Sequence, residues 1–129
     1  MTASTSMRSA LGKARSLGSA RTGVSHWWSQ RITAIGMIPL VLYLIAGLVL
    51  HAGADYDAAR AWLSSPFNAT AALLFFGVGF YHASLGVQVI IEDYVSSERC
   101  RLLAMVASKM VLTGLAALSL FSVLSVAFA

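Results

Sequence analysis

The chain has 129 residues, of which 58% are hydrophobic and only 11% are charged. A soluble domain of this size could not bury that much apolar surface, so the composition predicts a membrane protein with one domain at most. The formal net charge of +4 is modest, and the basic residues crowd the N-terminus. This pattern is typical of a topology signal and excludes a nucleic-acid surface as the main function. A single cysteine, Cys100, cannot form an internal disulfide.

The N-terminal segment is rich in serine, basic and free of acidic residues up to Arg31. A transit peptide has the same composition, and the basic start of a signal peptide looks similar. However, the apolar run that follows is long enough to span a bilayer, and no small-residue cleavage site follows that run. We therefore interpret residues 1–25 as a basic cytoplasmic tail, with a targeting sequence as the alternative.

Three apolar runs follow, at residues 32–50, 69–91 and 102–128. Each meets the requirement of roughly 20 residues for a helix that crosses about 30 Å of hydrocarbon. Helices are expected because they satisfy their own backbone hydrogen bonds. Only the third run contains a charge, Lys109, which lies about 10 Å inside it and can extend back to the surface. The sequence thus predicts an all-α membrane protein in which residues 26–129 form a three-helix anchor domain.

The distribution of basic residues predicts the orientation of these helices. Five Lys or Arg residues precede the first span, two lie in the second connection, and one lies in the first connection. The positive-inside rule therefore places the N-terminus and the second connection in the cytoplasm, and the C-terminus on the outer, periplasmic side. The predicted location is the bacterial cytoplasmic membrane rather than the mitochondrial inner membrane. The residues counted are Arg8, Lys13, Arg15, Arg21 and Arg31, then Arg99 and Arg101, then Arg60.

The second span contains the stretch YHASLGVQVIIEDY, which places His82 near the predicted bilayer midplane. A buried neutral imidazole needs one partner for its N–H and another for its lone pair. Three interpretations stay open: an interhelical hydrogen bond, axial ligation of heme iron, and a proton relay. Gly79 and Gly86 lie on the face of His82, one turn to either side, and allow either close helix packing or the approach of a flat macrocycle. If heme binds, a second axial ligand is expected from another chain, because no His or Met lies within reach on this face and His26 and His51 lie at the two ends of the first span.

Asp93 and Tyr94 end the second span and mark a different position. Tyr94 lies 12 residues beyond His82, which is about 18 Å along a helix axis. A carboxylate beside a phenol at the membrane surface can hydrogen-bond a polar head group and handle protons. The alternative is that the acidic pair only ends the helix and that Tyr94 is an interfacial anchor.

Several common catalytic patterns are absent from the sequence. It contains no glycine-rich dinucleotide fingerprint, P-loop, iron–sulfur cysteine cluster or Ser/His/Asp arrangement. The chain alone therefore has no catalytic residues for a water-soluble substrate, although it can hold a redox centre or a lipid-soluble ligand.

The motif HASLGVQVIIEDY resembles the small hydrophobic membrane anchor of succinate dehydrogenase (complex II). The gaps from His82 to Gly86 and from His82 to Asp93 and Tyr94 match the family, and the segment HWWSQRITA before the first span is also similar. The resemblance covers about residues 25–129 and agrees with three spans and an inside N-terminus.

The resemblance implies roles for individual residues. His82 would be an axial ligand of heme b iron, with the second histidine supplied by the partner anchor of the complex, its cytochrome b-type subunit. Tyr94 would hydrogen-bond a ubiquinone carbonyl at a site shared with that partner anchor and the iron–sulfur subunit, and Asp93 would lie beside that site. Arg31 would pair with a heme propionate or with Asp93, or would act only as a positive-inside charge.

The implied reaction is succinate oxidation coupled to ubiquinone reduction. The flavoprotein and iron–sulfur subunits would oxidise succinate, while this chain would help to bind heme b and ubiquinone in the membrane. Two alternatives stay open: the anchor of a fumarate reductase, and a non-redox structural or assembly protein of the membrane.

Overall fold

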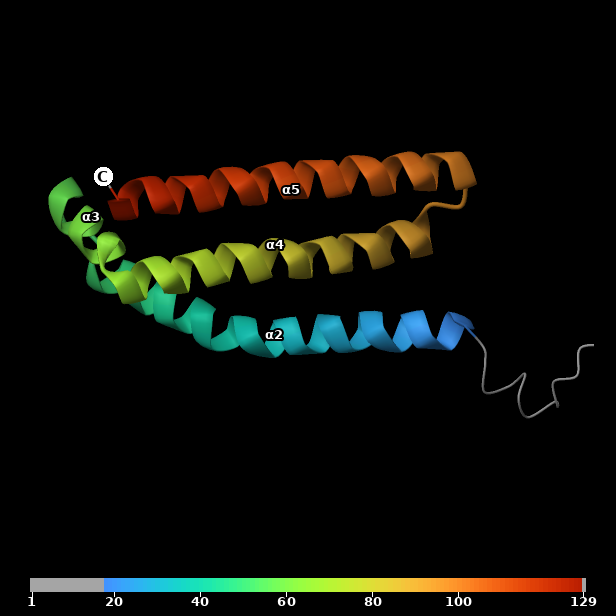
Figure 1. Cartoon of the computed structure of the whole chain (residues 1–129), viewed down its shortest axis with the longest axis horizontal. Helices are drawn as coiled ribbons and strands as arrows, with labels where there is room; N and C mark the ends of the chain where they lie inside the picture. The colour runs from blue at the N-terminus through green and yellow to red at the C-terminus, as the bar shows by residue number, and fades with distance from the viewer. Residues whose placement is uncertain (1–17, 129) are drawn as a thin grey trace, which may run out of the picture.

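The computed structural model describes residues 18–128, with side chains described from Gly23 onward. The helices of this part are α2 (Gly18–Leu50), α3 (Tyr56–Ser64), α4 (Pro66–Tyr94) and α5 (Glu98–Phe128). The three long helices lie in a row with α4 in the middle, and α3 lies at the end of the row where α2 and α5 finish (Figure 1). Within residues 18–128, α4 contacts both α2 and α5, whereas α2 and α5 do not contact each other.

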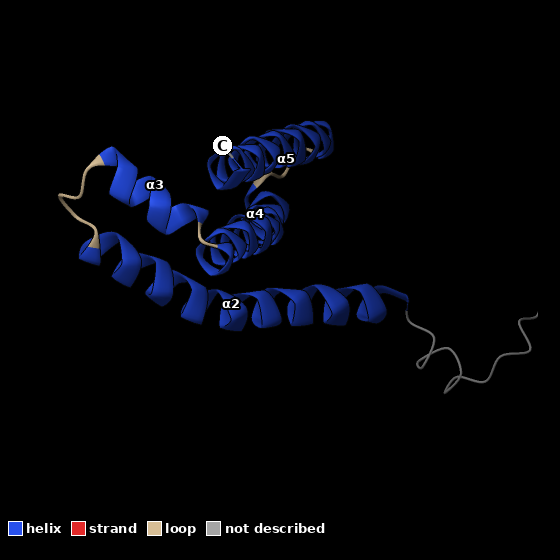
Figure 2. Ribbon diagram, turned by 60° about the vertical axis from the view of Figure 1, so that its left-hand side comes forward, coloured by secondary structure: helices blue, strands red, loops and turns tan. Residues whose placement is uncertain are grey.

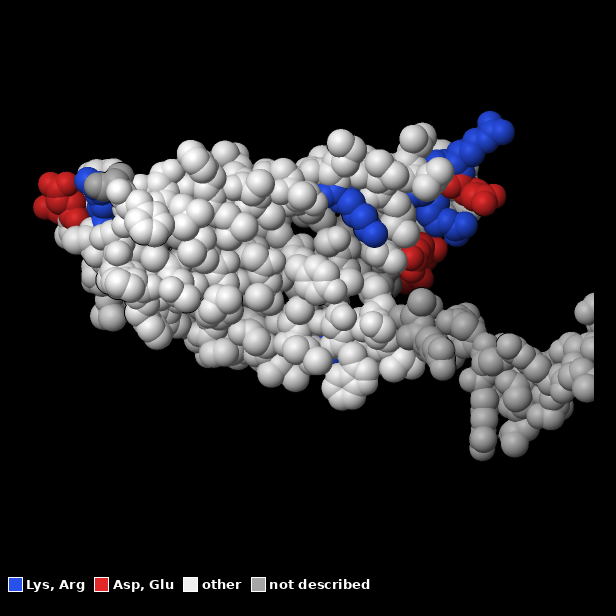
Figure 3. Space-filling view, in the orientation of Figure 1, with Lys and Arg blue, Asp and Glu red and all other residues white. Residues whose placement is uncertain are grey.

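The predicted all-α fold is confirmed for the described residues. Three segments are long and apolar enough to cross a membrane: Gly23–Leu50, Pro66–Tyr94 and Glu98–Phe128. On the face seen in Figure 3, most charged side chains lie toward the two ends of the row, and most of the surface between them carries no charge. This distribution is the one that a membrane-spanning layer requires. Arg8, Lys13 and Arg15 of the predicted tail, and the side chain of Arg21, lie outside the described part.

Helix α2 begins earlier than the apolar run at 32–50 that it contains. Its additional turns carry His26, Gln30 and Arg31, whose polarity conceals them from a search for apolar runs. These turns belong to the membrane span, because the middle of α2, counted from Gly23, lies beside the middle of α4 in the antiparallel pair. Met37 lies in the middle of Gly23–Leu50, and its Cε would be 3.3 Å from a Cβ placed on Gly79, which is in the middle of α4.

The second half of α2 bends away from α4, as Figure 2 shows. Pro39 lies inside the helix and has no N–H to donate to the preceding turn, which accounts for the bend. Helix α3 occupies the space that the bend opens, and Trp62 lies against α2 at Gly47. A Cβ atom on Gly47 would overlap the Trp62 ring, so glycine is required for this close approach.

Asn68 connects three helices at this end of the molecule. It is 7% exposed and is the buried polar residue of the described part. The Tyr43 hydroxyl of α2 donates to Asn68 Oδ1, and Asn68 Nδ2 donates to the carbonyl of Trp62 in α3 at 2.6 Å. Because Asn68 itself belongs to α4, one amide side chain joins α2, α3 and α4.

The sequence-based prediction of a connection over residues 51–68 missed α3. Local signals for this helix are present: Asp55 is its N-cap and accepts from the Ala58 N–H at 2.8 Å. The start of α4 is signalled in the same way, by Ser65 at the N-cap and Pro66 at the first helical position. A helix of nine residues is too short to be seen in a search for membrane spans.

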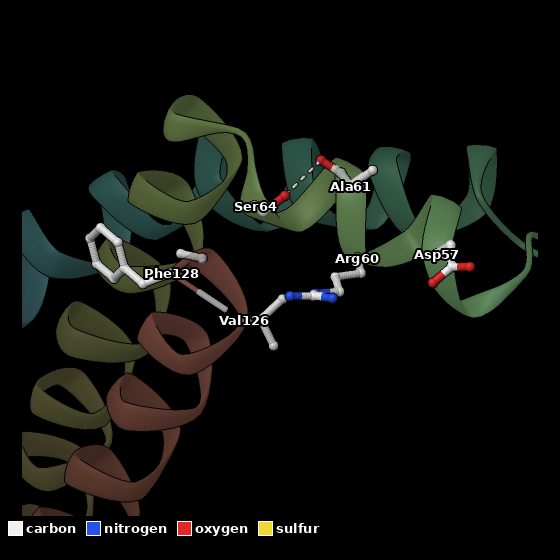
Figure 4. A pocket seen from close by; sticks show the side chains of 7 residues that line it. Asp57, Arg60, Ala61, Ser64, Val126 and Phe128 are labelled. Atoms are coloured by element: carbon white, nitrogen blue, oxygen red, sulfur yellow. Dashed lines mark hydrogen bonds between the residues drawn. The ribbon is translucent and has the colours of Figure 1, made fainter.

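A pocket of about 510 Å³ lies between α3 and the last turn of α5. Figure 4 shows Arg60 extending from α3 toward α5 near Val126, with Asp57 on the far side of the pocket. A cation near a helix C-terminus interacts favourably with the helix dipole. Arg60 therefore places its positive charge near the C-terminal end of α5, where the helix dipole favours it.

Candidate functional site

His82 projects from α4 toward α2 and is half-buried. Its Nδ1 lies 2.8 Å from Thr33 Oγ1, and its Nε2 lies 3.4 Å from the amide nitrogen of Gln30. The interhelical hydrogen bond, one of the three interpretations of His82, is therefore present in the structure. It engages Nδ1 closely, whereas the contact at Nε2 is long and comes from a flexible side chain.

A polar stripe on α2 faces this part of α4, formed by His26, Gln30 and Thr33 at helical spacings of four and three residues. Two of its atoms, His26 Nε2 and Gln30 Oε1, are buried and have no hydrogen-bond partner among the described residues. Leaving a buried polar group unpaired costs about 1–3 kcal/mol. The stripe is thus an incomplete polar site within this part of the chain, since neither atom gains its expected partner here.

Gly79 is at a close approach of α2 to α4, whereas Gly86 leaves room for a side-chain carbon. An added Cβ would lie 3.3 Å from Met37 Cε at Gly79 and 3.7 Å from Gln30 Nε2 at Gly86. Gly79 also lines an apolar pocket of about 270 Å³, one turn from His82, together with Met37, Phe75, Phe76 and Phe80. Gly79 thus serves helix packing and leaves apolar space on the His82 side of α4, whereas packing of α2 does not require glycine at position 86.

Asp93 and Tyr94 lie in the last turn of α4, which is unbroken from Pro66 to Tyr94. The predicted separation of about 18 Å from His82 therefore follows from the helical rise. Both side chains are exposed, Tyr94 at 83%. Glu92 and Asp93 place negative charge at a helix C-terminus that has no basic residue in its last turn, where the helix dipole disfavours it. Glu92 has a compensating contact, since its Oε1 accepts from Gln88 Nε2 one turn earlier at 2.9 Å, whereas no hydrogen bond of the described residues holds Asp93.

Arg31 lies on an exposed part of α2, with its guanidinium carbon 5.4 Å from the centre of the Trp27 ring. This distance is within the range of a cation–π contact. Gln30 lies opposite Gly86, so in the antiparallel pair Arg31 is roughly 12 Å along the axis from the level of Asp93. The structure does not bring Arg31 and Asp93 together.

Thr33, Gln30 and His26 were not among the site residues predicted from the sequence. Their spacing on one helical face was a signal that could have identified them. Thr33 lies within the predicted span at 32–50, but His26 and Gln30 precede that span and were not assigned to its helix. Within residues 18–128, no group of three or more His, Cys, Asp or Glu residues could hold a metal ion.

Comparison with known proteins gives consistent matches. Residues 5–116 match the model of the succinate dehydrogenase/fumarate reductase transmembrane subunit family. The succinate dehydrogenase hydrophobic membrane anchor subunit of Rickettsia bellii is 36% identical over 103 residues, covering 80% of this chain and 82% of that protein. Its counterpart in Rickettsia conorii is 38% identical over 90 residues, covering 69% and 71%. The succinate dehydrogenase membrane anchor subunit of Reclinomonas americana is 33% identical over 87 residues, covering 65% and 72%. No solved structure matches significantly.

Proposed function

The chain belongs to the succinate dehydrogenase/fumarate reductase transmembrane subunit family, and we propose that it is the hydrophobic membrane anchor of a succinate dehydrogenase. The observation that carries this proposal is the match to anchor subunits over most of the chain. The membrane-spanning row of α2, α4 and α5 supports the anchoring role. As an anchor, the chain contributes to an enzyme complex and has no succinate-oxidising site of its own.

We further propose that His82 binds heme b as an axial ligand through Nε2. The residues fit this group in two respects. The Nε2 atom has only one long contact among the described residues, with Gln30, whose own amide oxygen is buried without a partner there, so displacing Gln30 breaks no close hydrogen bond. Gly79 leaves apolar space one turn away. When bound, heme b supplies a one-electron redox centre inside the membrane.

The second axial ligand and the remaining wall of the heme site come from the partner anchor, the cytochrome b-type subunit of the complex. The described part of this chain supports that assignment, because α2 and α4 form one open side of a layer and not a closed bundle. Arg31, one residue from Gln30, is exposed and available to a heme propionate.

We propose that Tyr94 and Asp93 contribute to a ubiquinone site at the membrane surface. Their exposure at the end of α4 leaves both groups free for a ligand and for the iron–sulfur subunit, which receives electrons from the flavoprotein. The Tyr94 phenol would donate to a quinone carbonyl on which negative charge develops during reduction. Asp93 would tune that hydrogen bond or supply protons.

The orientation that fits these roles places the α4–α5 connection and the N-terminal end of α2 on the cytoplasmic side of a bacterial inner membrane. Both lie at the same end of the row in Figure 1. The excess of Lys and Arg in the N-terminal segment and in this connection supports the assignment.

The fumarate reductase anchor is the alternative within the same family. The names of the matched relatives refer to succinate dehydrogenase, which favours succinate oxidation. The quinone that the native complex uses would decide between the two directions.

The test is native purification through a tag on this chain, followed by identification of co-purifying subunits and a visible spectrum. We expect flavoprotein and iron–sulfur subunits together with the absorption of a low-spin heme b. His82→Ala should abolish or alter that spectrum, whereas His51→Ala, at the opposite end of α2, should leave it unchanged. An unaltered spectrum in the His82→Ala complex would rule out axial ligation, and purification without the soluble subunits would rule out the anchor function.

A further inference from the structure

Thr33 contacts His82 through a hydroxyl that is already held by its own helix. Its Oγ1 lies 2.7 Å from the carbonyl oxygen of Ser29 and 3.2 Å from that of Gln30. It also lies 2.8 Å from His82 Nδ1 on α4. Three groups therefore surround one hydroxyl, which has a single hydrogen to donate and two lone pairs to accept with.

These distances assign the tautomer of His82. A carbonyl oxygen can only accept, so the Thr33 hydroxyl donates its hydrogen to Ser29, the closer carbonyl. Toward His82 the same oxygen must accept, which places the imidazole hydrogen on Nδ1. The Nε2 atom then carries the lone pair, and the amide of Gln30 donates to it from 3.4 Å. The opposite tautomer would leave Nε2–H facing the amide N–H₂ of Gln30.

We propose that Thr33 is a positioning residue for heme ligation: it holds His82 in the Nδ1–H tautomer with Nε2 free to bind iron. This inference rests on the proposed function, in which His82 is an axial ligand. The acceptor is rigid, because Thr33 Oγ1 is hydrogen-bonded to the backbone of α2. The ring orientation of His82 is thereby tied to the packing of α2 on α4.

The hydrogen bond also affects the electronic character of the ligand. An N–H that donates to an acceptor makes the opposite ring nitrogen more basic. A more basic ligand stabilises ferric over ferrous iron and lowers the midpoint potential of the heme. Removing the Thr33 hydroxyl should therefore shift the midpoint potential to a more positive value and release the orientation of the imidazole ring.

The experiment compares Thr33→Val with Thr33→Ser in the purified complex with heme bound. Valine has nearly the shape of threonine but no hydroxyl, and serine keeps the hydroxyl. The measurements are a potentiometric titration of the heme and the electron paramagnetic resonance spectrum of its low-spin ferric form, which depends on ligand orientation. Thr70→Val is the matched control, because the Thr70 hydroxyl donates to the carbonyl of Pro66 at 2.7 Å and lies far from His82 along α4.

We expect a more positive potential and an altered ferric spectrum in Thr33→Val, with near-normal values in Thr33→Ser and Thr70→Val. Loss of heme from the valine variant alone would also support the proposal. Equal behaviour of the valine and serine variants, whether normal or defective, would overturn it. In that case, a changed spectrum in His82→Ala shows that only the positioning role has failed. An unchanged spectrum in His82→Ala removes heme ligation itself and this inference with it.

Discussion

Tyr94 presents its phenol on the exposed last turn of α4, where no side chain of residues 23–128 covers it. In the proposed quinone site, this phenol donates to an oxygen that becomes negative during reduction. Removing such a donor costs on the order of 10²-fold in rate. Tyr94→Phe should therefore slow quinone reduction strongly while the amount of assembled complex stays normal. The measurement is succinate-driven quinone reduction, normalised to the flavin content of the complex.

The matched control for this variant is Tyr56→Phe, an exposed tyrosine at the opposite end of the row. Its turnover should equal that of the unmodified complex. Normal turnover in Tyr94→Phe with the native quinone would contradict the role of the phenol, and loss of the assembled complex would indicate a structural role instead.

Gly47 is a second residue with a specific consequence, because its missing side chain makes room for Trp62. Gly47→Ala would force the indole off α2, and overpacking of this kind costs about 1–3 kcal/mol. We expect the chain in detergent micelles to lose helical structure at a lower denaturant concentration. Gly36→Ala is the control, since an added Cβ there has no neighbour within 4 Å. Equal stability of the two variants would show that Trp62 moves without cost.

At the scale of elements, Asn68 joins α2, α3 and α4 through Tyr43 and the Trp62 carbonyl. Asn68→Ala leaves the carbonyl and the Tyr43 hydroxyl without their partner, which should cost about 1–3 kcal/mol. Tyr43→Phe should cost less, because it removes only one of the two contacts. A double-mutant cycle on denaturation free energies measures the coupling between them, and additive effects would show that the Tyr43–Asn68 hydrogen bond is not stabilising.

The elements that could be predicted from the sequence are those that hydrophobicity alone requires. The runs at 69–91 and 102–128 each lie within one helix, because a bilayer leaves no other means to satisfy the backbone. Helix α3 could not be found in this way, since its stability depends on packing of Trp62 against Gly47 and on Asn68 from α4. Similarly, the polar residues Gln30 and Thr33 face His82, which only the pairing of α2 with α4 reveals.

In the candidate site, the residues that lie on one helix could be predicted from the sequence, and those that come from a second helix could not. A single helix fixes the spacing of His82, Asp93 and Tyr94, so the sequence placed them correctly relative to one another. Thr33 and Gln30 come from another helix, and their register against α4 depends on contacts such as that of Met37 with Gly79. Single-sequence periodicity carries no information on that register.

At the scale of the whole molecule, Cys100 offers a test of orientation. It is the single cysteine of the sequence and is exposed in the first turn of α5, at the end of the row proposed to be cytoplasmic. A membrane-impermeant maleimide should label it in inverted membrane vesicles and not in intact cells. Ala52→Cys in a Cys100→Ser background, at the opposite end, should show the reverse pattern. Labelling of Cys100 from outside intact cells would invert the proposed topology.

The row of helices has a consequence for the fate of the chain in the cell. Because α2 contacts α4 but not α5 within residues 18–128, one flank of the layer is left open to the proposed partner anchor. A newly made copy that meets no partner leaves this flank exposed to lipid, and its first helix, packed against the row on one side only, offers membrane proteases a point of attack. The abundance of this protein should therefore follow the supply of its partner and not its own rate of synthesis.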